Sequence, residues 1–295
     1  MSHEHVLSAQ PSPATLAWAL RQTGGSRVLA TEFLTGGVSH ANHALVLDGP
    51  RPRQVVLRRW ARPGWEESDP DFTVEREVAA LTVLERAGFP APRVLAADPE
   101  GRECDAPALL VTRLPGHGPD EDDEQSPRFL PQLAATAFAL HRVAPPWPGV
   151  PDYRPYNDLS DPRPPATSTR PEVWERAFAM VSAPPPPGPV CLIHRDYHQG
   201  NTLWRNGQIT GVVDWTTASR GCPDVDLGHM CWNLVVDYGE DRAEEFLRHY
   251  GALSGTEAHP YWLVRPVVDL LPDVELDEED LDALEPYLAR QLARG

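Results

Sequence analysis

The N-terminal third of the chain alternates between short apolar runs and residues that make turns. The apolar runs lie at residues 28–34, 44–47, 54–60, 93–97 and 108–114. Gly36-Gly37 separates the first two runs, and Asp48-Gly49-Pro50 separates the second from the third. Glycine and Asp-Gly between β-prone runs are typical of hairpins, so the pattern predicts an antiparallel meander.

Helical spacing of apolar residues predicts the other elements. In the N-terminal third it indicates a short helix ended by Gly24-Gly25, and a longer one that opens at Asp69-Pro70, includes Phe72 and ends at Gly88. Further helices are predicted at residues 130–141, 171–181, 225–236, 242–250, 261–271 and 281–292. The acidic run at 120–124 and most of the proline-rich stretch at 144–189 predict loops.

This order of elements divides the chain into two parts and predicts an α+β fold. Residues 1–114 form a small β-rich part with one main helix, and residues 115–295 form a larger, mainly helical part. The connection between the two parts is expected at about residues 111–116.

Composition excludes several classes of protein. No apolar run approaches the roughly 18 residues that a membrane span needs, and the N-terminus lacks the basic-then-apolar pattern of a secretory signal. Cysteines without C-x-x-C spacing favour free thiols in a reducing cytoplasm, which is the expected location. They are Cys104, Cys191, Cys222 and Cys231.

The charge balance is strongly acidic. The formal net charge is −17 at pH 7, and every basic residue among the 26 Lys and Arg positions is Arg. An acidic surface repels nucleic acid and anionic membranes, so neither is expected as a partner. The same surface would suit a cationic small molecule, although an acidic excess more often serves solubility.

The segment HRDYHQGN, residues 194–201, gathers polar side chains that fit two chemistries. His194, Asp196 and His198 alternate, as metal ligands on one strand face would, which suits a metal hydrolase. Alternatively, Asp196 and Asn201 have the D-x-x-x-x-N spacing of a kinase catalytic loop, with Asp196 as base and Asn201 as a magnesium ligand.

The next motif favours the kinase interpretation. A kinase loop needs a second magnesium-binding aspartate after a short hairpin, and two β-prone runs across Asn206-Gly207 lead to Asp214 in GVVDW. A hydrolase needs further ligands, and the remaining C-terminal histidines are single and widely spaced. These are His229, His249 and His259.

The motifs HRDYHQGNTLW, GVVDW and DVDLGHM resemble those of the aminoglycoside phosphotransferase-like family, from about Thr31 to the C-terminus. That family has the two-lobed protein-kinase-like fold and includes choline and homoserine kinases. The resemblance implies that Asp196 orients and deprotonates an acceptor hydroxyl, while Asn201 and Asp214 bind Mg²⁺ on the nucleotide phosphates.

The resemblance also implies structural support for the loop. His194 would fix the loop, and Asp226 in GCPDVDL would brace it from the following helix. Cys222 stands where the family pattern has aspartate. Arg195 and Gln199 stand where glycine and proline are more usual, which affects the acceptor side.

In the N-terminal part, the resemblance implies a nucleotide-binding lobe. Arg58 would take the place of the lysine that is usual on the third strand, with Glu77 as its ion-pair partner and Glu75 as the alternative partner. Strand alternation puts Arg59 on the opposite face. Backbone groups of the glycine turn, a neighbouring hydroxyl and the lobe connection would contact the nucleotide. These positions are Gly36, Gly37, Ser39, Val111, Thr112 and Arg113.

The acceptor is expected to be a small molecule, because only a short segment follows Asp214 before the helix expected from Asp224. Its pocket would lie between the catalytic loop and the C-terminal helices. The candidate lining residues are Trp215, Trp232, Tyr261, Trp262 and Asp269.

The sequence thus predicts an ATP- and Mg²⁺-dependent O-phosphotransferase, with GTP as the other candidate nucleotide. Its acceptor would be a hydroxyl of an aminoglycoside-like or other antibiotic. One alternative is a kinase of a metabolite such as choline, homoserine or a sugar. An alternative of another class is a nucleotide-binding module without catalysis, which the replacement of lysine by Arg58 keeps open.

Overall fold

The structure is a computed structural model that describes residues 6–35, 40–49, 53–65, 72–157, 159–271 and 274–295. It divides into two compact units, each made of more than one chain segment. Unit 1 comprises Met1–Pro115, Trp147–Val150 and Gly211–Thr217, and unit 2 comprises Gly116–Pro146, Pro151–Thr210 and Ala218–Gly295.

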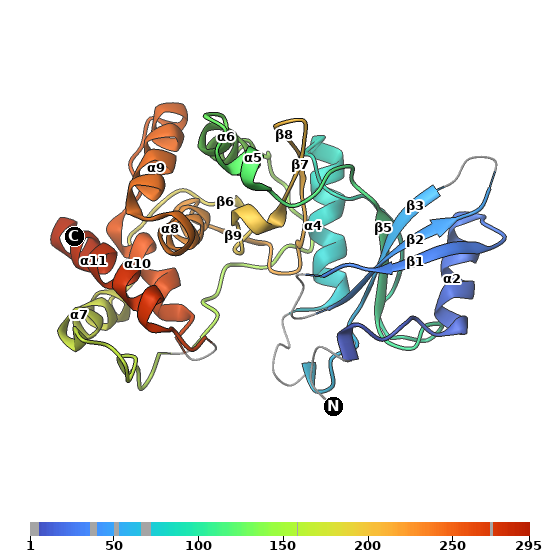
Figure 1. The fold of residues 1–295 in the computed structure, drawn as a ribbon, viewed down its shortest axis with the longest axis horizontal. Coiled ribbons are helices and arrows are strands. Elements are labelled where there is room, and N and C mark those ends of the chain that lie inside the picture. The colour runs from blue at the N-terminus through green and yellow to red at the C-terminus, as the bar shows by residue number, and fades with distance from the viewer. Residues whose placement is uncertain (1–5, 36–39, 50–52, 66–71, 158, 272–273) are drawn as a thin grey trace. The chain divides into compact units, whose positions relative to one another are not determined.

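Unit 1 is built on an antiparallel sheet, as the hairpin signals predicted. Among the described residues this sheet has five strands in the order β1-β2-β3-β5-β4 (Figure 1). The strands are β1 (Val28–Phe33), β2 (Ala41–Leu47), β3 (Arg53–Arg59), β4 (Val94–Asp98) and β5 (Ala108–Thr112). Strand β5 therefore lies beside β3, and the meander is extended at that edge.

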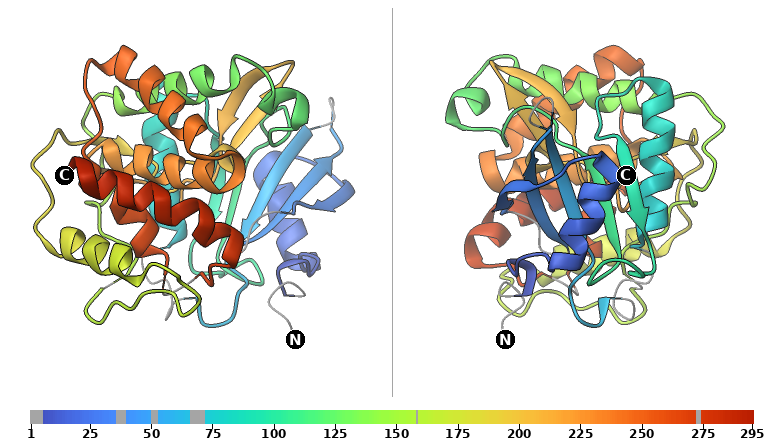
Figure 2. Two further views of the ribbon diagram at one scale, coloured as in Figure 1. Left: turned by 60° about the vertical axis from the view of Figure 1, so that its left-hand side comes forward. Right: turned by 90° about the vertical axis from the view of Figure 1, so that its right-hand side faces the viewer.

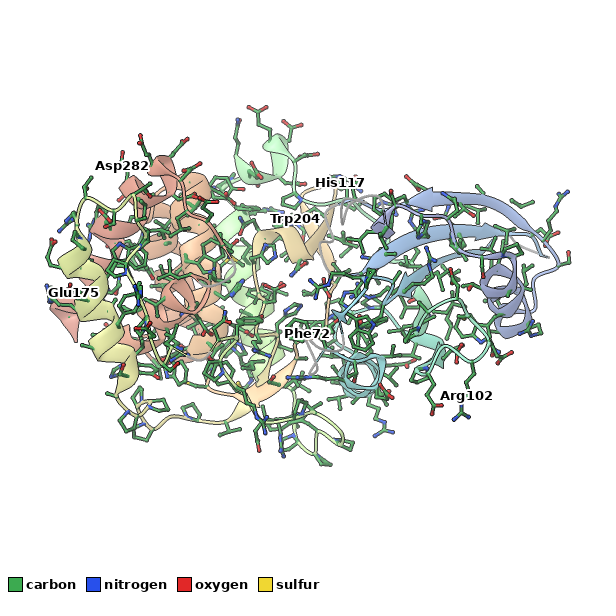
Figure 3. The ribbon with its side chains drawn as sticks, turned by 90° about the horizontal axis from the view of Figure 1, so that it is seen from below. Phe72, Arg102, His117, Glu175, Trp204 and Asp282 are labelled. Carbon is green, nitrogen blue, oxygen red and sulfur yellow. The ribbon has the colours of Figure 1, made fainter. Side chains whose placement is uncertain are left out.

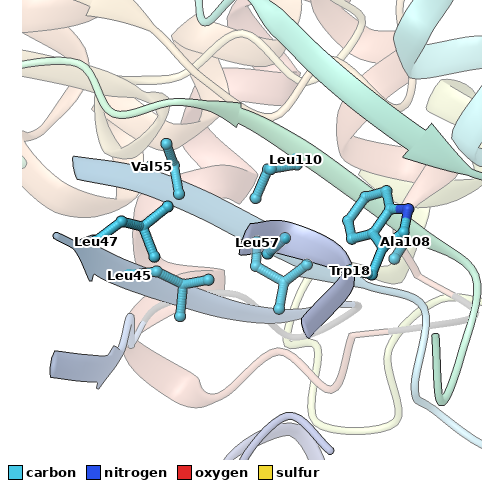
Figure 4. Close-up of a cluster of buried hydrophobic side chains, with 8 residues drawn as sticks. Trp18, Leu45, Leu47, Val55, Leu57, Ala108 and Leu110 are labelled. Atoms are coloured by element: carbon cyan, nitrogen blue, oxygen red, sulfur yellow. The ribbon is translucent and has the colours of Figure 1, made fainter. Parts of the chain in front are cut away.

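Helix α2 (Pro13–Thr23) covers one face of the sheet. Ser12 caps its N-terminus, and Gly24, at φ 69°, ends it. Trp18 and Ala19 pack on every second residue of the strands. Residues two apart in a strand point to the same face of the sheet. The strand residues in this cluster, all labelled in Figure 4, are Leu45, Leu47, Val55, Leu57, Ala108 and Leu110.

Helix α4 (Val74–Ala87) provides Glu77 to the opposite face, where Arg58 lies. Its N-cap is Thr73, whose side chain accepts a hydrogen bond from Arg76 N, and Gly88 ends it at φ 68°. The sequence placed Phe72 inside this helix, which is wrong, because the Thr73 cap fixes the start after it. The expected start at Asp69-Pro70 lies outside the described residues.

Unit 2 is mainly helical, as predicted. Helices α8 and α10 pack against each other, and so do α8 and α9, and α6 and α9 (Figure 2). The long helices are α6 (Phe129–His141), α7 (Pro171–Ser182), α8 (Asp224–Tyr238), α9 (Glu240–Ser254), α10 (Pro260–Asp269) and α11 (Glu278–Arg294). Within the part of the chain that is described, no helix is both long and apolar enough to cross a membrane.

Helices α8 and α10 approach each other at a glycine. A Cβ added to Gly228 would lie 1.9 Å from the Trp262 carbonyl oxygen and 3.0 Å from Pro266 Cγ. Only a residue without a side chain permits this contact.

The acidic run at residues 120–124 was expected to be a loop, and this prediction is wrong. It forms a one-turn helix, α5 (Glu121–Glu124), that opens with a reciprocal capping box between Asp120 and Asp123. Each side chain accepts a hydrogen bond from the other residue's backbone N–H, which satisfies groups that would otherwise lack partners at the helix start.

Short strands frame the segment that carries the candidate catalytic residues. Strand β6 (Cys191–Ile193) pairs antiparallel with β9 (Ser219–Gly221), and the 3₁₀ turn η1 (Gln199–Asn201) follows β6. The predicted hairpin is confirmed as β7 (Thr202–Arg205) and β8 (Gln208–Val212). Its two turn residues, Asn206 and Gly207, both have positive φ, as a type I′ turn requires.

The hairpin also forms backbone hydrogen bonds with the first residues of unit 2. The backbone groups of His117 and Trp204 exchange two hydrogen bonds, of 3.0 and 2.7 Å (Figure 3). The same approach leaves no room for a Cβ at Gly116, which would meet the Trp204 carbonyl oxygen at 2.5 Å.

Candidate active site

A buried carboxylate holds the beginning of the catalytic-loop segment in unit 2. Asp226 accepts hydrogen bonds from the backbone N–H groups of His194, at 2.9 Å, and Arg195, at 2.6 Å. It also lies 3.0 Å from His141 Nε2, and His141 Nδ1 lies 2.8 Å from the Tyr250 hydroxyl. Helices α6, α8 and α9 thus join in one polar network that fixes the backbone immediately before Asp196.

Arg195 has a left-handed backbone, with φ 73°, which is uncommon for a residue with a side chain. Its guanidinium stacks over the Tyr156 ring at 4.0 Å and lies 5.9 Å from the Tyr153 ring. This explains how a large residue occupies a position where the family more usually has glycine. Backbone conformations of this kind cluster at functional sites.

The carboxylate of Asp196 is held by two side chains. Asn201 Nδ2 donates to Asp196 Oδ2 at 3.0 Å and to the Asp196 carbonyl at 2.9 Å. His229 Nε2 lies 2.9 Å from Oδ1. Burial alone would raise the pKa of Asp196, but the hydrogen bond and charge of His229 outweigh it and hold this pKa well below its usual range.

The alternating residues of the segment do not form a metal site. Among the described residues, the grouping of potential metal ligands is His117, Asp120 and Asp123, so His194, Asp196 and His198 do not bring their ligand atoms together. The hydrolase alternative therefore has no geometric support in the described part of the chain.

In unit 1, Arg58 lies between two carboxylates. Its Nε is 3.1 Å from Glu77 Oε2, and its Nη2 is 2.7 Å from Asp214 Oδ1. The structure thus pairs Arg58 with Glu77. Burial alone would lower the pKa of Arg58, but the two carboxylates outweigh burial and raise this pKa above its usual value. Burial raises the pKa of Glu77 against the opposing charge of Arg58.

Thr216 completes this cluster. Its hydroxyl lies 3.0 Å from Glu77 Oε2, 3.3 Å from Asp214 Oδ1 and 3.2 Å from Arg58 Nη2. Asp214 has a left-handed backbone, with φ 64°, and a side chain that is 31% exposed. The tight turn after β8 therefore returns the Asp214 carboxylate to the face of the sheet that carries Arg58.

Arg59 lies on the opposite face of β3, as strand alternation predicted. Its Nη1 is 2.6 Å from Asp105 Oδ2, and its Nη2 donates to the Ala9 carbonyl. The two consecutive arginines thus have separate sets of partners, and both are buried.

Only some of the other positions expected to contact a nucleotide lie within the described residues. Gly36, Gly37 and Ser39 lie outside the described residues. Val111 and Thr112 form the end of β5, and the Thr112 N–H donates to the Arg93 carbonyl at 2.9 Å. Arg113 forms a 3.4 Å ion pair with Glu32. The amide of Thr112 is therefore already used within the sheet.

The residues expected to line an acceptor pocket have varied surroundings. Trp215 is fully buried in unit 1 against Phe89. Trp232 packs on the His229 ring, and the rings of Tyr261 and Trp262 pack on each other. Asp269 accepts from the N–H groups of Tyr156 and Asn157 and pairs with Arg265.

A hollow of about 560 Å³ lies in unit 2, next to the residues that contact Asp269. The five expected residues do not line it in the described part of the chain. Its lining residues are Pro155, Tyr156, Asn157, Leu159, Val181, Ser182 and Arg265. Asp269 lies behind this wall, where it fixes the backbone of Tyr156 and Asn157.

Residues in or beside these clusters that were not singled out from the sequence as site residues include His229, Thr216 and His40. His40 is buried against Trp60, with ring centroids 4.4 Å apart, and burial followed by the charge of Arg58 lowers its pKa to about 3. A usable signal existed for His229, because it stands three residues after Asp226 and thus on the same face of a helix.

Comparisons with known proteins agree with this geometry. The sequence profile of the phosphotransferase enzyme family (APH) matches residues 30–263. Hygromycin-B 4-O-kinase of Escherichia coli is 28% identical over 81 residues, which span 27% of this chain and 24% of that kinase.

Solved structures share the fold over nearly the whole chain. A thermostable mutant of aminoglycoside phosphotransferase APH(4)-Ia, in a ternary complex with ADP and hygromycin B, aligns with TM-score 0.66 and 18% identity, covering 95% of this chain and 98% of that one. Macrolide 2'-phosphotransferase MphH from Brachybacterium faecium aligns with TM-score 0.59 and 21% identity, covering 95% and 93%. These likenesses confirm the expected kinase-like fold class.

The profile match covers most of the chain, including the segments of Asp196, Asn201, Asp214 and Asp226. It confirms the expected enzyme class, a phosphotransferase. The chain belongs to the phosphotransferase enzyme family.

Proposed function

We propose that the protein transfers the γ-phosphate of ATP to a hydroxyl of a small molecule in a Mg²⁺-dependent reaction, with an aminoglycoside-like antibiotic as the acceptor. The observation that supports this most directly is the Asp196 carboxylate, whose two oxygens are held by Asn201 and His229. A carboxylate oriented in this way is suited to binding an acceptor hydroxyl.

In the proposed reaction, the acceptor hydroxyl donates a hydrogen bond to Asp196 and its oxygen attacks the γ-phosphorus. The bond between the γ-phosphorus and the oxygen bridging to the β-phosphate breaks, its electrons leave with ADP, and the hydroxyl proton passes to Asp196. Because the pKa of Asp196 is low, its main contribution is to orient the hydroxyl, and it takes the proton only as the new P–O bond forms.

Unit 1 is proposed as the nucleotide-binding part of the enzyme. Arg58 carries a fixed positive charge that suits a nucleotide phosphate, and Glu77 and Thr216 hold its guanidinium in place. Unit 2 is proposed as the part that carries the catalytic loop and binds the acceptor. A solved relative forms a ternary complex with ADP and hygromycin B, which supports a nucleotide and a small-molecule acceptor as the two ligands.

The donor atoms present fit Mg²⁺, which prefers carboxylate and carbonyl oxygens. The carboxylate of Asp214 is partly exposed, and because Asn201 turns its amide nitrogen toward Asp196, its amide oxygen is directed away from that residue. We assign Asn201 and Asp214 as the residues that would hold the ion. When bound, Mg²⁺ neutralises charge on the β- and γ-phosphates during transfer.

The charge of the chain and the ligands of its relatives both favour an aminoglycoside-like acceptor. A net charge of −17 favours a cationic acceptor, as aminoglycosides are at neutral pH. Hygromycin B is bound by one solved relative and named in the kinase relative from Escherichia coli.

The test is a coupled assay of ADP or GDP release with a panel of hygromycin B, other aminoglycosides, a macrolide, choline and homoserine. We expect release that depends on Mg²⁺ and on an aminoglycoside, and a phosphorylated product by mass spectrometry. Asp196→Ala should lower kcat by about 10²- to 10⁴-fold and leave nucleotide affinity nearly unchanged. Release with choline or homoserine alone, or turnover in Asp196→Ala within about threefold of the parent, would contradict the proposal.

A further inference from the structure

His229 comes to the catalytic loop from a distant part of the chain. It lies on α8, is 4% exposed, and contacts Asp196 Oδ1 through Nε2 at 2.9 Å. A carboxylate oxygen can only accept here, so Nε2 carries the proton and donates it. The contact therefore fixes the ring tautomer as well as the carboxylate.

Neighbouring residues contact both the ring and the backbone of His229. The Trp232 ring packs edge-on against it at 5.7 Å, and Asn233 Nδ2 donates to the His229 carbonyl at 2.8 Å. His198 stands with its ring centroid 6.0 Å from that of His229. The imidazole thus belongs to a packed set of side chains.

One face of α8 supports the loop at two points. Asp226 binds the backbone of His194 and Arg195, and His229, one helical turn later, binds the side chain of Asp196. Residues three apart on a helix lie on the same face, so one rigid element positions both the backbone and the functional group. Asn201 then holds the second oxygen from within the loop itself.

The Asp196 carboxylate can rotate about its Cβ–Cγ bond unless both oxygens are held. With Asn201 alone, only Oδ2 would be held by a side chain, and the carboxylate could still turn about that one hydrogen bond. With His229 as well, the carboxylate plane is fixed and one lone pair of Oδ1 is occupied, which leaves one lone pair of Oδ1 in a fixed direction. Catalysis gains when such a group is oriented before the substrate binds.

We propose that His229 is a positioning residue for phosphoryl transfer, which orients Asp196 toward the acceptor hydroxyl through its Nε2–H. This inference rests on the proposed function of Asp196. It assigns His229 to the chemical step and not to binding of either substrate.

The experiment compares three substitutions at one position. Gln places an amide N–H near the position of Nε2, Asn is one methylene shorter and does not reach Asp196, and Ala removes the donor. His229→Ala and His229→Asn should lower kcat by about 10- to 100-fold, the effect of losing a hydrogen bond to a charged group. His229→Gln should keep kcat within about fivefold of the parent. The KM for the acceptor and the nucleotide affinity should change by less than about threefold in all three.

The matched control is Cys231→Ala, a buried change on the same helix. It should lower thermal stability but keep kcat within about threefold. A loss in Cys231→Ala equal to that in His229→Ala would overturn the inference, because general loosening of α8 would then suffice. Equal activity of the Gln and Asn variants, or kcat within threefold of the parent in His229→Ala, would also overturn it.

A second measurement does not depend on turnover. Nitrogen–proton NMR correlations of the histidine rings in the full-length protein should show His229 protonated at Nε2, with its signals displaced in Asp196→Ala. A ring protonated at Nδ1 alone would overturn the inference. If the parent lacks kinase activity but shows this tautomer, the proposed function fails while the contact stands, so the two failures are distinguishable.

Discussion

Arg58 Nη2 lies 2.7 Å from Asp214 Oδ1, so the strand-three cation is bonded directly to the carboxylate that we assign to Mg²⁺. Glu77 binds the same guanidinium at Nε. Arg58 therefore has a structural task, the neutralisation of two acidic groups, besides the phosphate contact proposed for it.

Removal of Arg58 should cost stability and nucleotide affinity together. Arg58→Ala leaves the buried Glu77 without its counter-charge, and we expect the free energy of unfolding to fall by about 3 kcal/mol or more. Nucleotide affinity of the folded protein should fall by about 10- to 100-fold. Arg58→Lys should recover part of both, since it keeps the charge but not the fork of donors. Urea denaturation and nucleotide titration measure the two effects.

The control for this change is Arg21→Ala, which removes an exposed ion pair with Glu103. Such pairs contribute less than about 1 kcal/mol, and this variant should bind nucleotide like the parent. If Arg58→Ala keeps full nucleotide affinity once folded, Arg58 has only the structural task.

Arg59→Ala should lower stability without affecting nucleotide binding. Its guanidinium is buried and bonded to Asp105 and the Ala9 carbonyl, so its loss should reduce the free energy of unfolding by about 2–3 kcal/mol. Nucleotide affinity, measured at a temperature where the variant is folded, should stay within about twofold of the parent. A clear loss of affinity would show that the faces of β3 are not functionally separate.

Asp214→Asn should uncouple nucleotide binding from Mg²⁺. The amide keeps one oxygen but no charge, so the increase in nucleotide affinity that Mg²⁺ gives the parent should largely disappear. Nucleotide titrations in Mg²⁺ and in EDTA give the ratio of the two affinities. Thr216→Val, which removes the neighbouring hydroxyl, should retain most of it, and an unchanged ratio in Asp214→Asn would refute the metal assignment.

Acid should destabilise unit 1 through His43. This side chain is fully buried, and burial followed by the charge of Arg59 lowers its pKa to about 4. Between pH 6.5 and 4 the unfolded chain binds a proton that the folded protein does not, so stability falls as pH falls. The expected contribution is about 1.4 kcal/mol per pH unit.

His43→Leu should remove this contribution and flatten the acid limb of the stability curve, measured by urea denaturation between about pH 4 and pH 8. His249→Leu, a change at a partly exposed surface position, is the control and should keep the parent's slope. Identical slopes for His43→Leu and the parent would rule out His43 as the source. His40, whose pKa is lowered to about 3, should act in the same direction.

The parts of the fold that local patterns specify could be predicted from the sequence. Asn206-Gly207 specified the hairpin because its turn needs positive φ at both positions, and helical spacing located α6 to α11. The capping box of α5 was a local signal too, but a run of five acidic residues masks it, since such runs are more often solvated loops.

The side-chain contacts of the site required the fold. Arg58 and Glu77 could be paired only through the family resemblance, because their contact depends on how α4 crosses the sheet. The spacing between Asp226 and His229 indicates that they share a helix face, but the contact of His229 with the Asp196 side chain depends on how α8 packs on the loop. Trp215 follows Asp214 directly, yet the turn buries it against Phe89 and away from solvent.

The Gly228 contact restricts how this enzyme could change during evolution. Pro266 has no N–H, so it cannot bond the carbonyl of Trp262, the residue four positions earlier on α10, and that carbonyl instead approaches Gly228. Gly228 stands between Asp226 and His229, so any side chain gained there would push the helix that supports both away from the loop. Substitutions that alter acceptor preference should therefore arise away from this contact, while Gly228 and Pro266 are inherited together.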